Sequence, residues 1–599
     1  MTSVDELFKA GSGSSKRKFE PVQDPNELYK AAKLDSNGDV KSKGKEPMVE
    51  DDVEDDGEAG PELPPDFEED VPDDEEGRFF GGGMDQKTAQ AMEYIDQQEE
   101  EEAPQEKFDA AWVRRFALNF EKKISKNAEL RAKFENDGKK YMSSEADLHT
   151  EIQGLSILSE HPELYEEFAK MGCVGSLVSL LSHDNTDIAI EVIQVLGELT
   201  DEDVDAPQEQ WDALVNAMID ADVIELLASN LSRLDEKEDA DRAGVYYTLG
   251  VMENLASQSA LAEKLGQDTS IISWILSRIQ QKESPVSQNK QYSAEVLAIL
   301  LQSSAKNRER LIGLDGIDIV LQLLSQYRRR DPESDSDEEE YVENLFDCLI
   351  CLVDESGGKE KFIEAEGIEL AQIMLKESKF SKPRALKVLD HALGGVSGGP
   401  ACERLVEAAG LGSVFGLFMR KVRIISKGTR TKTHKLKQQE GGNIEHILGI
   451  FASLLRLLPG GSAPRTRTLA KFMEKDYGKV EKLIKLRREY AARISPVEQA
   501  IEKERKGYSR EDQEYMAAEW LSRRLDAGLF SLQTIDVILA WLIAEDAGAQ
   551  KKIEALFADQ DENLSLVRGT LQEQLEGLSE EEPAQKDFKD MLSALLQFV

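Results

Sequence analysis

The segment GIDIVLQLL, residues 316–324, decides the fold because its pattern returns along the chain. A small or glycine-containing turn comes first, and an apolar run that ends in large side chains follows it. The pattern occurs at Gly175–Leu181, Ala221–Leu227, Thr269–Leu276, Gly316–Leu324, Gly367–Leu375 and Gly410–Phe418. The last large residues of successive copies lie 46, 49, 48, 51 and 43 residues apart. This regular period predicts a chain built from repeated helical units.

Between these segments, apolar residues recur at helical spacing, as at Leu148, Ile152 and Leu155. Several runs are apolar on more than one side, namely Thr248–Ala256, Ser293–Leu301, Asn344–Leu352 and Ala385–Leu393. Stacked helical layers bury both sides of such a helix, whereas a lone amphipathic helix exposes one. Armadillo and HEAT units have periods of about 40–47 residues. We therefore expect an all-α, armadillo/HEAT-like, right-handed superhelical solenoid.

The acidic charge is concentrated near the N-terminus. The 599-residue chain carries 117 acidic and 73 basic side chains, a net charge of −44. Residues 51–102 hold 22 of the acids and only two basic residues, which gives −20. A stretch this rich in charge has too few apolar side chains to bury, so it cannot offset the conformational entropy that the chain loses on folding. We therefore expect residues 1–106 to form a disordered arm. A charge this negative also argues against a protein that coats nucleic acid or anionic lipid over its whole surface.

The chain is expected to have three parts: the arm at 1–106, a repeat solenoid at 107–460, and C-terminal helices at 461–599 that cap or extend it. Residues 466–494 carry charge on most faces and indicate a long exposed helix or helix pair, which Pro496 should end. Four cysteines, and the lack of an apolar run of roughly 18 residues, favour a soluble intracellular protein without a membrane partner.

No sequence signature of an enzyme is present. The chain lacks GxxxxGK[ST], a GxGxxG that opens a helix after a strand, GxSxG and HExxH. Cys348 and Cys351 form a CxxC, but they lie within an apolar helical run without a second pair, which favours buried thiols over a metal site. We expect no catalysis, no cofactor and no bound metal.

Two basic segments are candidates for recognition. Lys16, Arg17 and Lys18 are a candidate nuclear localisation signal, although three basic residues also occur by chance in many tails. Residues 420–437 contain no acid and are expected to form a basic loop, with the candidate contacts Arg420, Lys421, Arg423, Lys427, Arg430, Lys432, Lys435 and Lys437. The loop could contact RNA phosphates or an acidic partner, including the acidic arm, or it could be a solvated loop.

The acidic segment Asp331–Glu340 contains two candidate phosphorylation sites, Ser334 and Ser336. Each has an acidic residue three positions later, the arrangement that acidophilic kinases favour. Phosphorylation would add further negative charge. An ordinary acidic loop is the alternative.

Six longer runs resemble the beta-catenin-like protein 1 family: His183–Thr200, Tyr292–Gln302, Leu314–Ser325, Glu343–Leu349, Ala385–Ala392 and Arg523–Leu532. They follow the family's order, and the resemblance extends from about Phe108 to the C-terminal helices. It implies a nuclear armadillo-type solenoid without known catalytic activity. It also implies association with the Nineteen complex of the spliceosome, binding to a Myb-type splicing factor, and recognition of basic, nuclear-localisation-like segments. The N-terminus departs from animal members, which have a richer, two-part basic signal.

A solenoid offers an extended concave surface, and acidic residues on it would attract Lys/Arg-rich peptides. The candidate groove residues are polar residues that interrupt the apolar runs of the helices, and each either lines the groove or caps a neighbouring helix. They are Glu191, Glu198, Glu253, Asn254, Glu295, Glu343, Asn344 and Asp390. Direct contact with RNA is expected to be absent or confined to the basic loop.

An import adaptor of the karyopherin-α type is the competing hypothesis. That class needs tryptophan and asparagine pairs on successive repeats. The five tryptophans lie at 112, 211, 274, 520 and 541, outside the helices that contain Asn254 and Asn344. The N-terminal arm also lacks a strong basic helix for importin-β.

Overall fold

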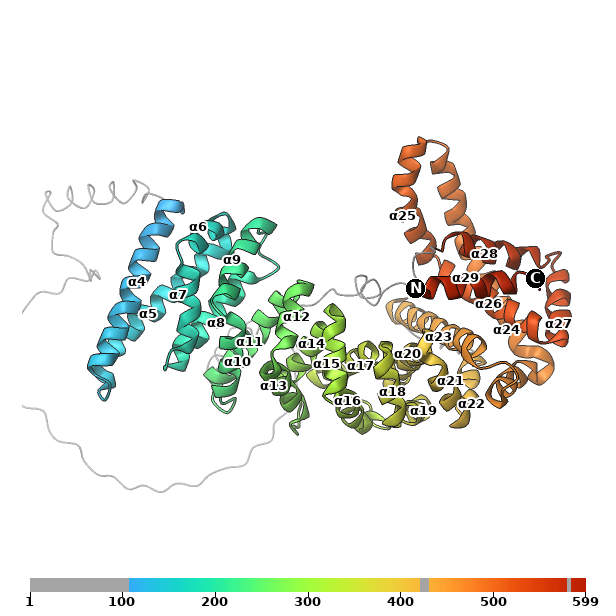
Figure 1. Ribbon diagram of the computed structural model, residues 1–599, viewed down its shortest axis with the longest axis horizontal. Coiled ribbons are helices and arrows are strands. Elements are labelled where there is room, and N and C mark those ends of the chain that lie inside the picture. Colours follow the sequence, from blue (N-terminus) through green and yellow to red (C-terminus); the bar gives the residue numbers. More distant parts are fainter. Residues whose placement is uncertain (1–106, 421–429, 579–582) are drawn as a thin grey trace, which may run out of the picture. The chain divides into compact units, whose positions relative to one another are not determined.

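The computed structural model describes residues 107–420, 430–578 and 583–599 (Figure 1). Every regular element in these ranges is a helix, and none of the described residues forms a strand. The predicted all-α class is therefore confirmed. The predicted arm at 1–106, with its basic cluster and acidic stretch, lies outside the described residues.

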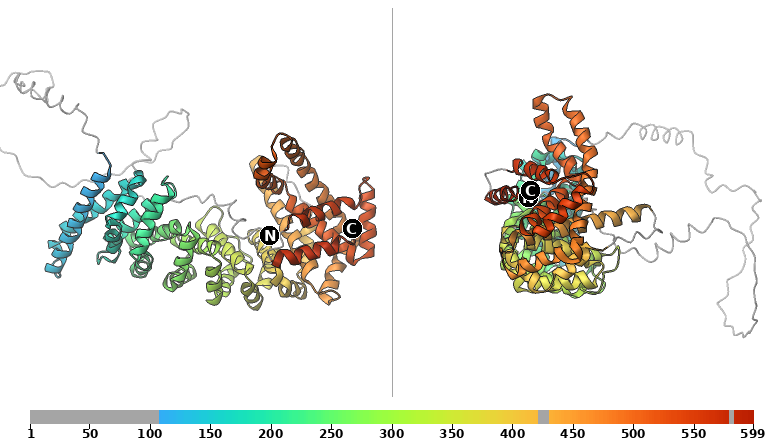
Figure 2. Two further views of the ribbon diagram at one scale, coloured as in Figure 1. Left: turned by 45° about the horizontal axis from the view of Figure 1, so that its top comes forward. Right: turned by 90° about the vertical axis from the view of Figure 1, so that its right-hand side faces the viewer.

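After α4 (Ala110–Lys133) and α5 (Met142–Gln153), the helices follow one another in triplets (Figures 1 and 2). The first helices of the triplets are α6 (Tyr165–Lys170), α9 (Gln208–Asp220), α12 (Ser259–Gln267), α15 (Ala305–Gly313), α18 (Ser356–Glu364) and α21 (Gly399–Glu407). The second helices are α7 (Cys173–Ser179), α10 (Val223–Arg233), α13 (Thr269–Gln280), α16 (Gly316–Leu324), α19 (Gly367–Glu377) and α22 (Leu411–Phe418).

The third helices, which we call the ladder helices, each pack against the third helix of the next triplet. They are α8 (Thr186–Thr200), α11 (Asp239–Ala256), α14 (Gln288–Ser303), α17 (Asp337–Asp354), α20 (Ser381–Leu393) and α23 (Arg430–Leu457). Triplets joined through a continuous series of helices are the architecture of an armadillo-type solenoid. The repeated segments recognised in the sequence all fall on the second helix of a triplet, and the multi-sided apolar runs all fall on ladder helices.

Apolar residues on opposite sides of each ladder helix are buried, because a neighbouring helix covers each side. On α8, Val192, Ile193, Val195 and Leu196 are at most 1% exposed. Asn185 caps the start of this helix, since its side chain accepts a hydrogen bond from the backbone N–H of Asp187 at 3.1 Å. Burial and capping together define this helix.

The recurrent glycine before the second helix has a packing role. At α19, the residue with left-handed backbone is Glu366 (φ 57°), and Gly367 follows it with an ordinary conformation. A β-carbon at Gly367 would overlap the ring of Phe362, and one at Gly316 would overlap Leu311. The glycines therefore allow the first and second helices of a triplet to approach closely.

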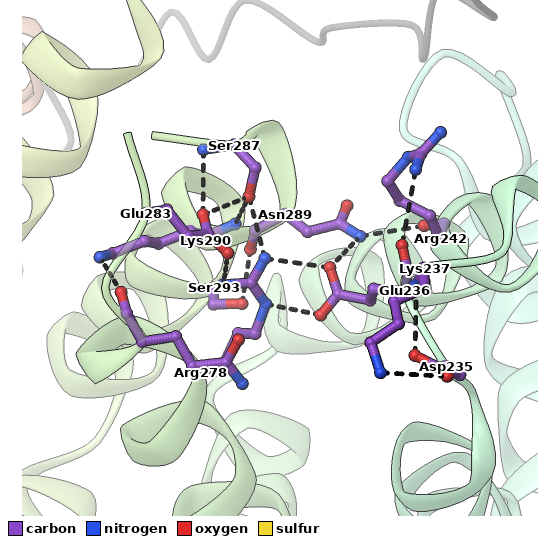
Figure 3. A network of polar contacts seen from close by, with 11 residues as sticks. Asp235, Glu236, Lys237, Arg242, Arg278, Glu283, Ser287, Asn289, Lys290 and Ser293 are labelled. Atoms are coloured by element: carbon purple, nitrogen blue, oxygen red, sulfur yellow. Dashed lines mark hydrogen bonds and ion pairs between the residues drawn. The ribbon is translucent and has the colours of Figure 1, made fainter. Parts of the chain in front are cut away.

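A buried polar network joins two triplets where α10, α11, α13 and α14 meet (Figure 3). The guanidinium of Arg278 donates to Glu236 through Nε at 2.6 Å and Nη2 at 3.0 Å, and its Nη1 lies 2.8 Å from Glu283. Asn289 donates to the Glu236 carboxylate at 2.9 Å and to the Arg242 carbonyl at 2.9 Å. Because Arg278 is only 3% exposed, these carboxylates replace the water that would otherwise stabilise its positive charge.

After the last triplet, α24 (Ala463–Arg505) packs on α26 (Leu529–Glu545) and α27 (Ala547–Ala558). The boundary expected at residue 460 falls in the connection before α24. The remaining elements are α25 (Arg510–Asp526), α28 (Ser565–Glu576) and α29 (Pro583–Leu595). Residues 474–477 interrupt α24, as in the predicted helix pair.

Two details of the C-terminal prediction are wrong. First, Pro496 does not end the helix, because α24 continues through it. Both Pro496 and Ala492 are exposed, so water can solvate the carbonyl that the proline leaves without a donor. Second, the helix is not exposed on most faces. It buries Arg487 against Asp536 through hydrogen bonds of 2.7 and 3.1 Å.

Replacing the buried guanidinium tests whether the polar network stabilises the stack. Arg278→Ala leaves Glu236 and Glu283 without their common partner, and we expect unfolding to become easier by about 3 kcal/mol. Asp239→Asn is the control, since it removes only an exposed ion pair to Arg242, worth at most about 1 kcal/mol. Urea unfolding followed by circular dichroism measures both. Equal effects of the two substitutions would contradict the role assigned to Arg278.

Candidate peptide-binding face of the ladder helices

The structure places all eight candidate groove residues on ladder helices. Every one of these side chains is partly exposed. The burial of both sides of each ladder helix leaves only a narrow exposed strip, and the candidates lie on these strips. Their surroundings divide them into an acidic group on α8, α11 and α14 and a group paired with basic side chains on α17 and α20.

The first part of the acidic group joins α8 and α11. Burial raises the pKa of the Glu191 carboxyl; His149 acts in the opposite direction and Glu198 in the same direction. The His149 Nδ1 lies 3.8 Å from the Glu191 carboxylate. Tyr247 of α11 lies near both glutamates: burial, Glu191 and Glu198 all raise its pKa. A half-buried tyrosine therefore lies within electrostatic reach of two carboxylates.

The second part joins α11 and α14. The rings of Tyr246 and Tyr292 lie 5.0 Å apart, and the Tyr292 hydroxyl donates to the Glu253 carboxylate. Burial, and then the charge of Glu253, raise the pKa of Tyr292. Glu295 accepts from Gln291 one turn earlier at 2.7 Å. We call these carboxylates and rings the acid–tyrosine stripe: Glu191, Glu198, Tyr246, Tyr247, Glu253, Tyr292 and Glu295.

The stripe lacks basic partners at several positions. Within the described part of the chain, no lysine or arginine forms an ion pair with Glu191, Glu198 or Glu295; the donors to Glu198 and Glu295 are the neutral amides of Gln194 and Gln291. At the end of α8, Glu198 also lines a cleft of about 580 Å³ with Glu160, Asp201, Asp203 and Asp205. This part of the surface is therefore strongly negative.

Asn254 forms hydrogen bonds to the preceding ladder helix. Its Nδ2 donates to the carbonyl of Gly197 at 3.1 Å and to the hydroxyl of Thr200 at 3.2 Å. These acceptors belong to the last turn of α8, where carbonyls lack intrahelical partners. Of the two roles the sequence left open, capping of a neighbouring helix is the one that Asn254 performs.

On α17 and α20, the acidic candidates have side-chain partners from within the protein. Glu343 forms an ion pair with Arg384, and the Asp390 carboxylate lies 3.0 Å from the His446 Nδ1. Asp347 pairs with Lys387 at 3.6 Å. Glu343, Asp347, Arg384, Lys387 and His446 line a cleft of about 340 Å³. Asn344 is partly exposed, and its side chain forms no hydrogen bond within the described ranges.

Sequence reasoning missed the tyrosines of the stripe and the cations opposite Glu343 and Asp347. Tyr247 and Tyr292 directly precede the apolar runs of α11 and α14, and Arg384 directly precedes that of α20. Aligning the repeats on these runs would have revealed a common, partly exposed position that is Tyr247, Tyr292, Glu343 and Arg384 on successive ladder helices. In a solenoid, residues about one repeat apart in the sequence become neighbours in space, so this alignment identifies which side chains lie opposite one another.

The predicted basic loop at 420–437 is wrong for its second half. Arg430, Lys432, Lys435 and Lys437 belong to the first turns of α23. Residues 431–440 contain neither glycine nor proline and include several strong helix formers, so the helix extends through them. Arg420 is exposed, whereas Lys421, Arg423 and Lys427 lie outside the described residues.

The remaining candidates are placed as follows. Ser334 and Ser336 lie in the turn that enters α17. Lys16, Arg17 and Lys18 lie outside the described residues. All four cysteines are buried free thiols, and burial raises the pKa of Cys351 to about 12.

Two further findings concern metals and membranes. In the described ranges, no group of three or more His, Cys, Asp and Glu side chains is placed to hold a metal ion. No single described helix has the length and apolarity to cross a membrane, although the bent pair α25 and α26 meets those two criteria jointly.

Known proteins resemble this chain over most of its length. The family described as "Catenin-beta-like, Arm-motif containing nuclear" matches residues 89–572. The Schizosaccharomyces pombe "Beta-catenin-like protein 1 homolog" is 37% identical over 509 residues, which cover 85% of this chain and 86% of that protein. The Homo sapiens "Beta-catenin-like protein 1" is 39% identical over 480 residues, 79% and 83% of the two chains.

Among solved structures, a designed armadillo repeat protein shares 14% identity and a TM-score of 0.33 over 46% of this chain and 99% of its own. The extent of the family match and the identity to these relatives establish the relationship. The chain belongs to the catenin-beta-like family of armadillo-motif proteins.

Proposed function

We propose that this chain is a non-enzymatic scaffold of the nuclear pre-mRNA splicing machinery, and that it binds basic, nuclear-localisation-like segments of partner splicing factors. The observation that carries this proposal is the acid–tyrosine stripe, where carboxylates lie beside tyrosine rings on consecutive ladder helices. Family membership supports the nuclear location, because the family's description includes the word nuclear. The family resemblance suggests the Nineteen complex and its Myb-type factor as partners.

The chemistry of the stripe suits lysine and arginine side chains. Their aliphatic stems can pack on the rings of Tyr246, Tyr247 and Tyr292, while their charged ends approach the carboxylates. Glu191 is already partly desolvated, as its raised pKa indicates, so a bound cation would interact with it more strongly than with a fully exposed carboxylate. The peptide would thereby replace the basic partners that this part of the surface lacks.

The charge pattern also predicts where such a peptide binds along the ladder. On α17 and α20, Arg384 and Lys387 already neutralise Glu343 and Asp347. A basic peptide would have to displace these side chains, whereas among the residues that the structure describes it meets no lysine or arginine paired with Glu191, Glu198 or Glu295. Binding is therefore directed to α8, α11 and α14.

The import-adaptor alternative has no support from the tryptophans. Trp211 lies on α9 and Trp274 on α13, so neither is on a ladder helix. Affinity purification of the full-length chain from nuclear extract, followed by mass spectrometry, distinguishes the two functions. We expect splicing factors with basic segments to be recovered. Recovery of importin-β with varied basic cargo would instead support the adaptor.

Neutralising the two carboxylates of the stripe on α8, Glu191 and Glu198, should weaken peptide binding. For Glu191→Gln/Glu198→Gln we expect a loss of about tenfold in affinity for a fluorescent peptide with four Lys/Arg residues, equivalent to about 1.4 kcal/mol. Glu343→Gln is the matched control, since Glu343 is paired with Arg384, and its effect should be less than about twofold. Fluorescence anisotropy at two salt concentrations measures both, and the wild-type affinity should fall with salt. Similar losses in both variants would exclude the stripe as the binding surface.

The pH dependence of peptide binding provides a separate test. A bound cation favours the ionised form of Glu191, whose pKa in the free protein is raised above its ordinary value of 4.5. Affinity should be complete above this raised pKa and be lost as the pH falls through it. Glu191→Gln should move the midpoint of the loss to lower pH. An unchanged midpoint in calorimetric titrations would show that Glu191 does not contact the peptide.

A further inference from the structure

The turn from Asp331 to Ser336, which enters α17, is held at both ends. The Asp331 Oδ1 accepts hydrogen bonds from the Ser378 hydroxyl at 3.0 Å and from the backbone N–H groups of Lys379 and Phe380 at 3.2 and 3.1 Å. At the other end, the backbone N–H of Asp335 donates to the Glu339 carboxylate at 2.7 Å. The two serines of this acidic segment therefore lie in a defined conformation.

The hydroxyl groups of Ser334 and Ser336 have different surroundings. Ser336 is the N-cap of α17: its Oγ accepts from the backbone N–H of Glu339 at 3.3 Å and donates to the carbonyl of Glu333 at 2.7 Å. Ser334 is exposed, and its hydroxyl has no hydrogen-bond partner among the described residues. Only Ser334 presents an oxygen that an enzyme can reach without opening the cap.

Acidic residues follow both serines. Ser334 is followed by the exposed Asp335, which has left-handed backbone (φ 57°), and by Asp337 three positions later. The acid three positions after Ser336 is Glu339, whose carboxylate already accepts the Asp335 N–H. Both serines therefore have an acidic residue three positions later, and the accessibility of the hydroxyl is what distinguishes them.

We propose that Ser334 is the site in this turn at which an acidophilic protein kinase, with ATP as the phosphoryl donor, modifies the folded protein. The Ser334 Oγ forms a bond to the γ-phosphorus, the bond from that phosphorus to the bridging oxygen breaks so that ADP leaves, and the hydroxyl proton passes to the catalytic base of the kinase. The phosphate adds a charge of about −1.5 to −2. Residues 331–340 already contain seven Asp/Glu and no Lys/Arg, so the modification deepens the negative charge of this turn.

Thr200 is an internal control, because the sequence Thr200-Asp201-Glu202-Asp203 has the same acidic spacing. Thr200 is only 2% exposed, and its hydroxyl donates to the carbonyl of Leu196 at 2.8 Å. The structure therefore predicts that Thr200 is not modified in the folded chain.

The test is phosphorylation of the full-length chain by a purified acidophilic Ser/Thr kinase and ATP, with occupancy at each site followed by mass spectrometry. In the folded protein, Ser334 should be modified at least about tenfold faster than Ser336, because modification of Ser336 requires local opening of the helix cap. Thr200 should remain unmodified. A synthetic peptide of residues 328–345 lacks the fold, and both of its serines should be modified at similar rates.

Two variants complete the test. Ser334→Ala should remove phosphate from this turn. Ser336→Asn keeps an N-cap side chain and should leave the rate at Ser334 unchanged. Equal rates at the two serines in the folded protein would overturn the proposal. Failure of Ser334 to react in the folded protein, while the peptide reacts, would also overturn it.

Discussion

Burial of the ladder helices on both sides is the constraint on which the rest of the structure depends. Val192, Val251 and Val296, on three successive ladder helices, are all fully buried. Each side chain of this kind contributes about 1.5–3 kcal/mol when it is removed from water. An isolated helix of the same length would be marginally stable in water, so each ladder helix depends on its neighbours. Only a narrow strip of each remains exposed, and this strip is the surface available for recognition.

The strips differ in charge because the side chains opposite the acids differ. On α8, Glu191 and Glu198 face Tyr247 of the next ladder helix, which cannot neutralise them. On α17, Glu343 meets Arg384 of the next ladder helix. The same architecture therefore produces a surface that attracts cations in one region and a neutral surface in another. Charge complementarity of this kind contributes more to specificity and association rate than to total affinity.

The sequence alone was sufficient to predict the helical repeats, since apolar periodicity and repeat spacing are local signals. It was misleading at Pro496, because a solvent-facing carbonyl tolerates a proline, and at residues 430–437, because basic residues are also good helix formers. The ladder positions of Glu191, Glu198, Glu253 and Glu295 were also predictable. The side chains that surround these carboxylates were not, because they come from residues about one repeat away.

The central claim is that a basic peptide binds to the strips of α8, α11 and α14. Photo-crosslinking tests it most directly, with a Lys/Arg-rich peptide that carries one photoreactive side chain and the full-length chain, followed by mapping of the crosslinks by mass spectrometry. We predict crosslinks at Tyr246, Tyr247, Tyr292 and their neighbours, which excess unlabelled peptide abolishes. Crosslinks confined to α17 and α20, or to the acidic residues 51–102, would contradict the claim.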